Sequence, residues 1–167
     1  MSRTLLLPLV LSFAFLLVAL PVVAQTPALA GTYKLLEVDN ISPDGTHIHL
    51  YGEHPQGLLT LDSVGRYSLQ IYRSERPKFA AKDKSKGTPE EYQAAVQGCN
   101  THFGRYSVDP QDHTITFNVE QASFPNWEGT SQRLKYTLDG TRLTYVVATP
   151  TSGGNVKGEV VWERLEP

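Results

Sequence analysis

The chain has 167 residues and a formal charge of −2 at pH 7, from 15 basic and 17 acidic side chains. This weak acidity argues against nucleic acid and anionic membranes as partners, because both are bound through clustered lysine and arginine. The single cysteine, Cys99, cannot form a disulfide within the chain, so the stability of the fold must come from its core.

Residues 1–24 have the pattern of a secretion signal peptide. A basic start at Arg3 precedes an apolar run over residues 5–20, and Val22-Val23-Ala24 places small residues before a cleavage site. The run is at the short end of the roughly 20 residues that a membrane-spanning helix needs. We therefore expect residues 25–167 to form one periplasmic or secreted domain with no stable membrane anchor after cleavage.

The first part of this domain alternates apolar and polar residues in short runs, which is typical of β-strands. The expected strands cover residues 31–38, 58–61 and 67–72. Between the first two lies a segment with His47, His49 and His54, and imidazoles two apart on a strand share a face. Only Glu53 stands nearby as a further ligand, so we interpret the histidines as solvated and expect no metal or other cofactor.

A helix is predicted between the third and fourth strands. Thr88 and Glu91 form a capping box with Pro89 at the first helical position, and Gly98 follows the expected end at Gln97. Apolar residues recur at helical spacing on one face: Tyr92, Ala95, Val96 and Cys99. This pattern predicts a packed helix face that keeps Cys99 buried and slow to react.

Five more strands are expected, over residues 102–108, 115–119, 132–138, 143–147 and 156–164. Asp139-Gly140 predicts a type I′ hairpin turn between two of them. Glu120 and Arg133 lie on neighbouring strands and are expected to form an exposed ion pair, with the alternative that one of them faces the cavity. A lysine cluster lies in a segment with few apolar residues and is interpreted as a solvated loop: Lys78, Lys82, Lys84 and Lys86.

Eight strands with short turns predict an all-β fold, an antiparallel up-and-down barrel with one short inserted helix. Such a sheet must close or stack to lose its edges. Eight strands enclose enough room for side chains or for one small ligand.

The chain resembles the bacterial and fungal lipocalin-like domain family of small calycin-type barrels. The resemblance covers nearly all of residues 25–167 and depends on these segments: Gly31-Thr32-Tyr33, Tyr51-Gly52, Pro55-Gln56-Gly57, Tyr67 to Arg73, Arg76-Pro77, Phe103-Gly104-Arg105-Tyr106, Phe124-Pro125-Asn126-Trp127, Gly129-Thr130, Leu138-Asp139-Gly140 and Val161-Trp162-Glu163-Arg164. The first strand carries Tyr33 where lipocalins have tryptophan. The resemblance implies a barrel with an apolar cavity, and an arginine of the last strand, here Arg164, over the ring of Tyr33.

The first functional hypothesis is binding of a small apolar or amphipathic molecule in the barrel cavity. Its candidate ligand-binding residues are the apolar members of each alternation, and the tyrosines among them could orient a polar end of the ligand. They are Leu59, Leu61, Tyr67, Leu69, Ile71, Tyr106, Phe117, Val119, Leu134, Tyr136 and Tyr145.

Two alternatives stay open. One is an enzyme of isomerase or cyclase type acting on such a molecule, although no known catalytic motif is present and no catalytic residue is assigned. The other is a structural or inhibitory envelope protein whose side chains fill the barrel. The sequence leaves the ligand and the oligomeric state open.

We predict that the exported protein begins at Gln25, because Val22-Val23-Ala24 forms the cleavage site. N-terminal sequencing of the protein exported by its own host checks this. A first residue of Met1 or Ser2 would show that the apolar run is retained.

Overall fold

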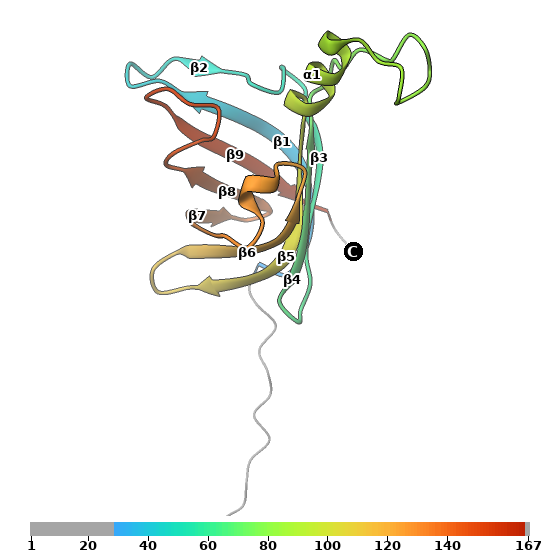
Figure 1. Ribbon diagram of the computed structural model, residues 1–167. Helices are drawn as coiled ribbons and strands as arrows, with labels where there is room; N and C mark the ends of the chain where they lie inside the picture. Colours follow the sequence, from blue (N-terminus) through green and yellow to red (C-terminus); the bar gives the residue numbers. More distant parts are fainter. Residues whose placement is uncertain (1–28, 166–167) are drawn as a thin grey trace, which may run out of the picture.

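A computed structural model describes residues 29–165, whose strands form one antiparallel sheet that closes on itself (Figure 1). The elements follow in chain order: β1 (Gly31–Ile41), β2 (His47–Ile48), β3 (Gln56–Leu61), β4 (Arg66–Tyr72), α1 (Pro89–Gln97), β5 (Cys99–Asp109), β6 (Thr114–Ala122), the 3₁₀ helix η1 (Pro125–Trp127), β7 (Ser131–Asp139), β8 (Arg142–Val147) and β9 (Lys157–Arg164). Within the described residues, the eight longer strands and the inserted helix confirm the predicted barrel. The predicted signal segment and cleavage site lie outside this range.

Pairing of β1 with β9 closes the barrel. Tyr33 lies opposite Arg164 and Ile41 lies opposite Lys157, in a ladder with one register shift after Leu35. On its other edge β1 pairs with β3 and then with the two-residue strand β2. β1 is therefore paired along most of its length with β9 and at both of its ends with β3 and β2, which removes the two edges that an open sheet would expose.

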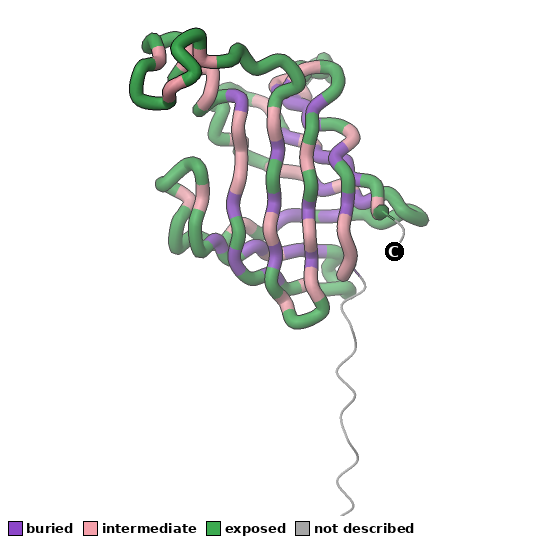
Figure 2. Tube along the Cα trace, turned by 90° about the vertical axis from the view of Figure 1, so that its right-hand side faces the viewer, coloured by how far each residue is buried: buried purple, intermediate pink, exposed green. Residues whose placement is uncertain are grey.

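Side chains alternate between the interior and the outer surface along each strand. Figure 2 shows this as buried positions separated by intermediate or exposed ones. Large apolar side chains with an exposed fraction of 0% include Tyr33, Phe117, Leu143 and Trp162. Each such side chain stabilises the fold by roughly 1.5–3 kcal/mol relative to an exposed position.

Gly104 is required where β5 and β6 approach closely. The register between these strands shifts between Phe103 and Gly104, and a Cβ at Gly104 would overlap the carbonyl oxygen of Asn118. That oxygen belongs to the backbone of β6, so a side chain could be accommodated only by displacing the strand.

The β7–β8 hairpin is confirmed, but its turn lies one residue later than predicted. Asp139 pairs with Arg142, so Gly140 and Thr141 make the turn. Gly140 has φ +58°, whereas Asp139 and Thr141 are not among the described residues with positive φ. Glycine at the first central position is typical of a type II′ turn, and the type I′ prediction is wrong.

The capping box of α1 is confirmed, but its predicted packing is wrong. The Thr88 hydroxyl accepts from the Glu91 N–H at 3.2 Å, and the Glu91 carboxylate accepts from the Thr88 N–H at 2.9 Å. No residue of the helix is buried, and Val96 is 68% exposed. The helix lies at one end of the barrel instead of across a sheet face (Figure 1), so its apolar residues have no sheet to cover. Cys99 is the first residue of β5 and is half-buried, whereas the sequence predicted a buried side chain.

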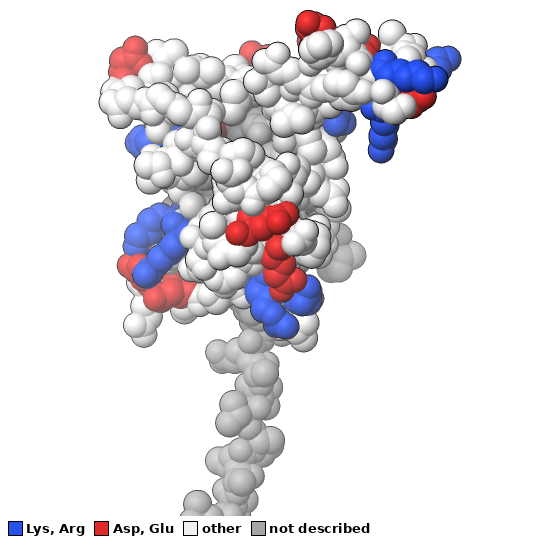
Figure 3. Space-filling view, viewed as in Figure 1, with Lys and Arg blue, Asp and Glu red and all other residues white. Residues whose placement is uncertain are grey.

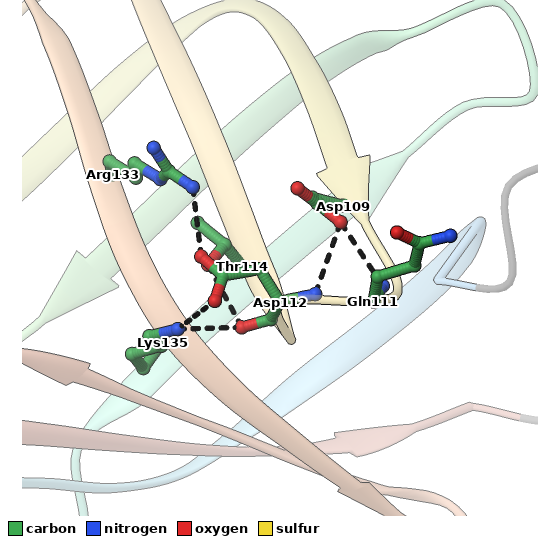
Figure 4. A network of polar contacts seen from close by, with 6 residues as sticks. All are labelled: Asp109, Gln111, Asp112, Thr114, Arg133 and Lys135. Atoms are coloured by element: carbon green, nitrogen blue, oxygen red, sulfur yellow. Dashed lines mark hydrogen bonds and ion pairs between the residues drawn. The ribbon is translucent and has the colours of Figure 1, made fainter.

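The predicted Glu120–Arg133 pair does not form. Arg133 lies opposite Thr116, and its guanidinium instead donates to Asp112 in the β5–β6 turn at 2.8 Å. Lys135 donates to the same carboxylate at 2.6 Å (Figure 4). Glu120 pairs with Arg66 at 3.0 Å. These groups are all well exposed, so each pair contributes at most about 1 kcal/mol.

The four lysines of the cluster ahead of α1 are exposed, as predicted for a solvated loop. Figure 3 shows lysine and arginine side chains gathered at that corner, with both signs of charge mixed lower on the same face. Within residues 29–165, no helix has the length and apolar character needed to cross a membrane.

Arg164 seals one end of the barrel as the resemblance implied. Its guanidinium carbon lies 5.1 Å from the centroid of the Tyr33 ring, and its Nε donates to the Tyr33 hydroxyl at 3.1 Å. That hydroxyl donates in turn to the backbone carbonyl of Leu29 at 2.8 Å. Tyr33 and Leu29 are both fully buried, so the contact connects the first strand, the last strand and the segment that enters the barrel.

We predict that Arg164→Ala lowers the free energy of unfolding by about 1–3 kcal/mol, through loss of the contact with the Tyr33 ring and of the donors to its buried hydroxyl. The control is Arg142→Ala, an exposed arginine beside the β7–β8 turn, which should change stability by no more than about 0.5 kcal/mol. Urea unfolding measures both. Equal midpoints for the two variants would contradict the role given to Arg164.

Candidate functional site

One end of the barrel is open and contains a cavity of about 610 Å³. Successive connections of an up-and-down sheet alternate between its two ends, so the long connections share one end and the short ones share the other. The short turns are 62–65, 110–113 and 140–141. The long connections, which surround the cavity opening, are 42–55, 73–98, 123–130 and 148–156.

The cavity wall is mostly apolar and nearly uncharged. Arg73, at the rim, is the one charged side chain among the described residues that line it. The strands contribute these lining residues: Val38 and Asn40 from β1, Leu69 and Ile71 from β4, Cys99, Asn100 and His102 from β5, Phe117 from β6, Gln132 and Leu134 from β7, Tyr145 and Val147 from β8, and Gly158 and Val160 from β9. A ligand held here would therefore be oriented by uncharged polar side chains and not by charged ones.

The eleven predicted ligand-binding residues divide into those that line the cavity and those that do not. Five line the cavity: Leu69, Ile71, Phe117, Leu134 and Tyr145. The other six are buried but do not line it: Leu59, Leu61, Tyr67, Tyr106, Val119 and Tyr136. Two of these six side chains contact the short turns and so lie away from the cavity. The Tyr106 hydroxyl donates to the backbone carbonyl of Asp62 in the β3–β4 turn, and the Tyr136 ring contacts His113 in the β5–β6 turn. Tyr106 and Tyr136 therefore lie at the closed end, whereas Val119 lies further along β6 towards the open end than Phe117.

His102 and Tyr67 form a buried polar pair beside the cavity. The Tyr67 hydroxyl and His102 Nδ1 are 2.7 Å apart, and His102 is 6% exposed. Burial lowers the pKa of His102 to about 4 and raises the pKa of Tyr67. Near neutral pH the imidazole is therefore uncharged and the phenol keeps its proton. The phenol can donate to Nδ1, which makes Nε2 the protonated ring nitrogen.

Aromatic rings enclose the imidazole of His102. Phe117 and Trp127 meet it edge to face, with ring centroids at 6.1 Å and 5.7 Å. Phe124 packs against Trp127 at 5.5 Å and also lines the cavity. Phe124 and Trp127 flank Pro125-Asn126, so the connection that carried much of the family resemblance forms part of the cavity rim.

The wall also carries uncharged polar residues: Asn40, Tyr51, Gln97, Asn100, Ser123, Gln132, Thr151 and Ser152. The Asn40 amide donates to the Ser152 hydroxyl at 2.8 Å, which joins β1 to the β8–β9 connection at the rim. Asn100 presents a side-chain oxygen that is buried and without a hydrogen-bond partner among the described residues. The sequence prediction did not single out any of these groups or His102. A signal existed for His102, because it shares the alternation of Tyr106 on β5.

The three histidines near the rim are not gathered into one site. Nδ1 of His47 and Nδ1 of His49 lie 2.7 Å and 2.8 Å from the two oxygens of the buried Asp39 carboxylate. His54 has no part in this cluster. Among residues 29–165, no group of three or more His, Cys, Asp or Glu side chains is arranged to hold a metal ion. The Asp39 contacts, led by its hydrogen bond, raise the pKa of His49.

Comparisons with known proteins give the following matches. A family model for the lipocalin-like domain matches residues 30–165. A 4'-hydroxy-3'-methoxypropiophenone carrier protein of Aspergillus oryzae (strain ATCC 42149 / RIB 40) is 27% identical over 106 residues, which are 59% of this chain and 96% of that protein. The crystal structure of a lipocalin-like protein from Bacteroides uniformis ATCC 8492 is 16% identical with a TM-score of 0.43, covering 82% of this chain and 98% of that one.

We predict that titration of His102 makes the fold less stable in mild acid. The pKa of His102 is about 4 in the folded protein, whereas the ordinary pKa of histidine is 6.5, so the unfolded chain binds more protons between these two pH values. The contribution of neutral His102 to the free energy of unfolding is fully present above about pH 6.5 and is lost as the pH falls towards about 4. This contribution falls by about 2 kcal/mol between about pH 7.5 and about pH 5. Over this pH range, the free energy of unfolding measured with urea should therefore fall by about 2 kcal/mol more in wild type than in His102→Asn.

His49→Asn is the matched control for this experiment. The pKa of His49 is raised, so its contribution has the opposite sign and is largest in acid. Its removal should steepen the acid loss of stability, whereas His102→Asn should flatten it. The same pH dependence in wild type and His102→Asn would show that His102 does not cause the effect.

Proposed function

The chain belongs to the lipocalin-like domain family, and from this premise we propose that it binds one small, neutral, mostly apolar or amphipathic molecule inside the barrel. The observation that carries the proposal is the cavity of about 610 Å³ with a single charged side chain on its wall. Its volume lies within the roughly 300–1,000 Å³ that ligand sites of drug-sized molecules occupy. The barrel is filled at one end and hollow at the other, which also argues against a protein whose side chains fill the barrel throughout.

The curated relative supports an aromatic ligand. That protein is named as the carrier of a substituted propiophenone, and the alignment spans nearly all of it. In the present chain, Phe117, Phe124 and Trp127 line the cavity and would provide ring surfaces for a similar compound. Our proposal is therefore a carrier of small aromatic molecules.

Binding is better supported than catalysis. An isomerase or cyclase needs an acid or base on the cavity wall that works near neutral pH. His102 lines the cavity, and its pKa of about 4 makes it a weak base. A hydrogen-bond donor to a bound molecule is the role that this imidazole fits.

We further propose that the carrier acts outside the cytoplasm, in the periplasm or the surrounding medium. The support is the signal-peptide pattern of residues 1–24 in the sequence.

We predict that Val147→Trp weakens binding of a neutral apolar probe at least about tenfold, because the indole would occupy the cavity that Val147 lines. Its matched control is Val146→Trp, on the same strand at a position that does not line the cavity. That variant should bind within about twofold of wild type. Titration with N-phenylnaphthylamine, followed by its fluorescence, measures all three proteins.

Circular dichroism checks that both variants keep the fold. Equal weakening by the two substitutions, or unchanged binding by Val147→Trp, would contradict a ligand site inside the barrel.

A further inference from the structure

We propose that His102 recognises the ligand through its Nε2–H, and that the ligand is a neutral aromatic compound with a carbonyl oxygen that accepts this hydrogen bond. The proposal rests on the proposed binding function and adds the chemistry that the cavity selects.

Tyr67 fixes which nitrogen of His102 carries the proton. Within the described part of the chain, His102 Nδ1 is the one hydrogen-bond partner of the Tyr67 hydroxyl, at 2.7 Å. A buried hydroxyl needs an acceptor for its proton, and the neutral imidazole offers one at Nδ1. The neutral ring then carries its own proton on Nε2.

Nε2 is open to the cavity. Among residues 29–165, no protein group is hydrogen-bonded to it. In the described part of the chain, the fully buried side-chain atoms without a partner are Asn100 Oδ1 and Trp162 Nε1. Nε2 is not among them, so it keeps some accessible surface, on a residue that lines the cavity. The structure thus presents a donor of fixed identity to whatever occupies the barrel.

The surroundings make this donor strong and selective. Phe117 and Trp127 flank the imidazole, so a hydrogen bond formed there lies among apolar rings and is little weakened by water. A ligand without an acceptor would leave the donor unsatisfied once water is expelled. This favours molecules that place an oxygen at Nε2 and a flat ring against the aromatic side chains.

The same surroundings disfavour an anionic ligand. Arg73 is exposed at the rim, where its guanidinium donates to the carbonyl of Leu50 at 2.8 Å. A carboxylate at Nε2 would be buried beside an uncharged imidazole, because the pKa of His102 is about 4. Burying an unpaired carboxylate is far more costly than burying a ketone. A ketone or a related neutral carbonyl therefore fits the site better than an acid.

The proposal is tested with three naphthalenes that carry different substituents at the same ring position. They are acetylnaphthalene as the ketone, ethylnaphthalene as the hydrocarbon and naphthoate as the acid. Quenching of tryptophan fluorescence gives the dissociation constants at neutral pH. We expect wild type to bind the ketone about tenfold more tightly than the hydrocarbon, and the acid most weakly. Infrared spectroscopy should show the ketone carbonyl stretch shifted to lower frequency when bound, which tests the hydrogen bond without any substitution.

Two variants separate the roles of the ring nitrogens. His102→Asn places its side-chain oxygen near the position of Nδ1, so Tyr67 keeps an acceptor while the donor to the cavity is lost. His102→Gln places its amide nitrogen near the position of Nε2 and restores a donor. We expect the preference for the ketone and its infrared shift to disappear in His102→Asn and to persist in His102→Gln.

Each outcome decides a different claim. Equal binding of ketone and hydrocarbon by wild type, tightest binding of naphthoate, or an unchanged preference in His102→Asn would overturn the role of His102 while the binding function stands. If wild type binds none of the three compounds and also fails to bind N-phenylnaphthylamine, the proposed function itself is wrong, and this inference with it.

Discussion

Closure of the sheet by β1 and β9 is the constraint on which the rest of the structure depends. The ladder between them satisfies the backbone of both strands, and Arg164 joins it to the buried Tyr33 hydroxyl and through that to Leu29. An open sheet of the same strands would expose two edges and could not enclose an interior. The cavity exists because this seam holds the first and last strands together at the sealed end.

The two ends of the barrel differ because the chain uses short turns at one and long connections at the other. Tyr106 and Tyr136 pack beneath the short turns, where little room remains. The long connections bring α1, the Phe124–Trp127 segment and the β8–β9 connection around the opening instead. Charged groups such as Asp112, Arg133 and Lys135 lie outside, which leaves the interior nearly neutral.

The pair of Tyr67 and His102 is an exception within this apolar interior. Burial disfavours the protonated imidazole, so His102 destabilises the fold as the pH falls, even though its neutral form is hydrogen-bonded to Tyr67. A core built for stability alone would have apolar residues at both positions. The pair fits a site in which a neutral, oriented donor serves a ligand, and that is the basis of the inference drawn for His102.

The sequence by itself determined the strand order and the capping box of Thr88 and Glu91, because alternation and capping are local properties. The contact of Arg164 with Tyr33 was implied by the family resemblance and by the closure of the barrel. Period two also identified eleven buried strand residues, since it reports the face of a strand, but it missed His102. It could not report depth along the barrel axis, which separated Leu69 from Leu59 and depends on the lengths of all the connections. Only the tertiary structure decided that α1 lies at the rim, that Arg133 reaches Asp112, and that His102 meets Tyr67 and Trp127, because those contacts join segments far apart in the chain.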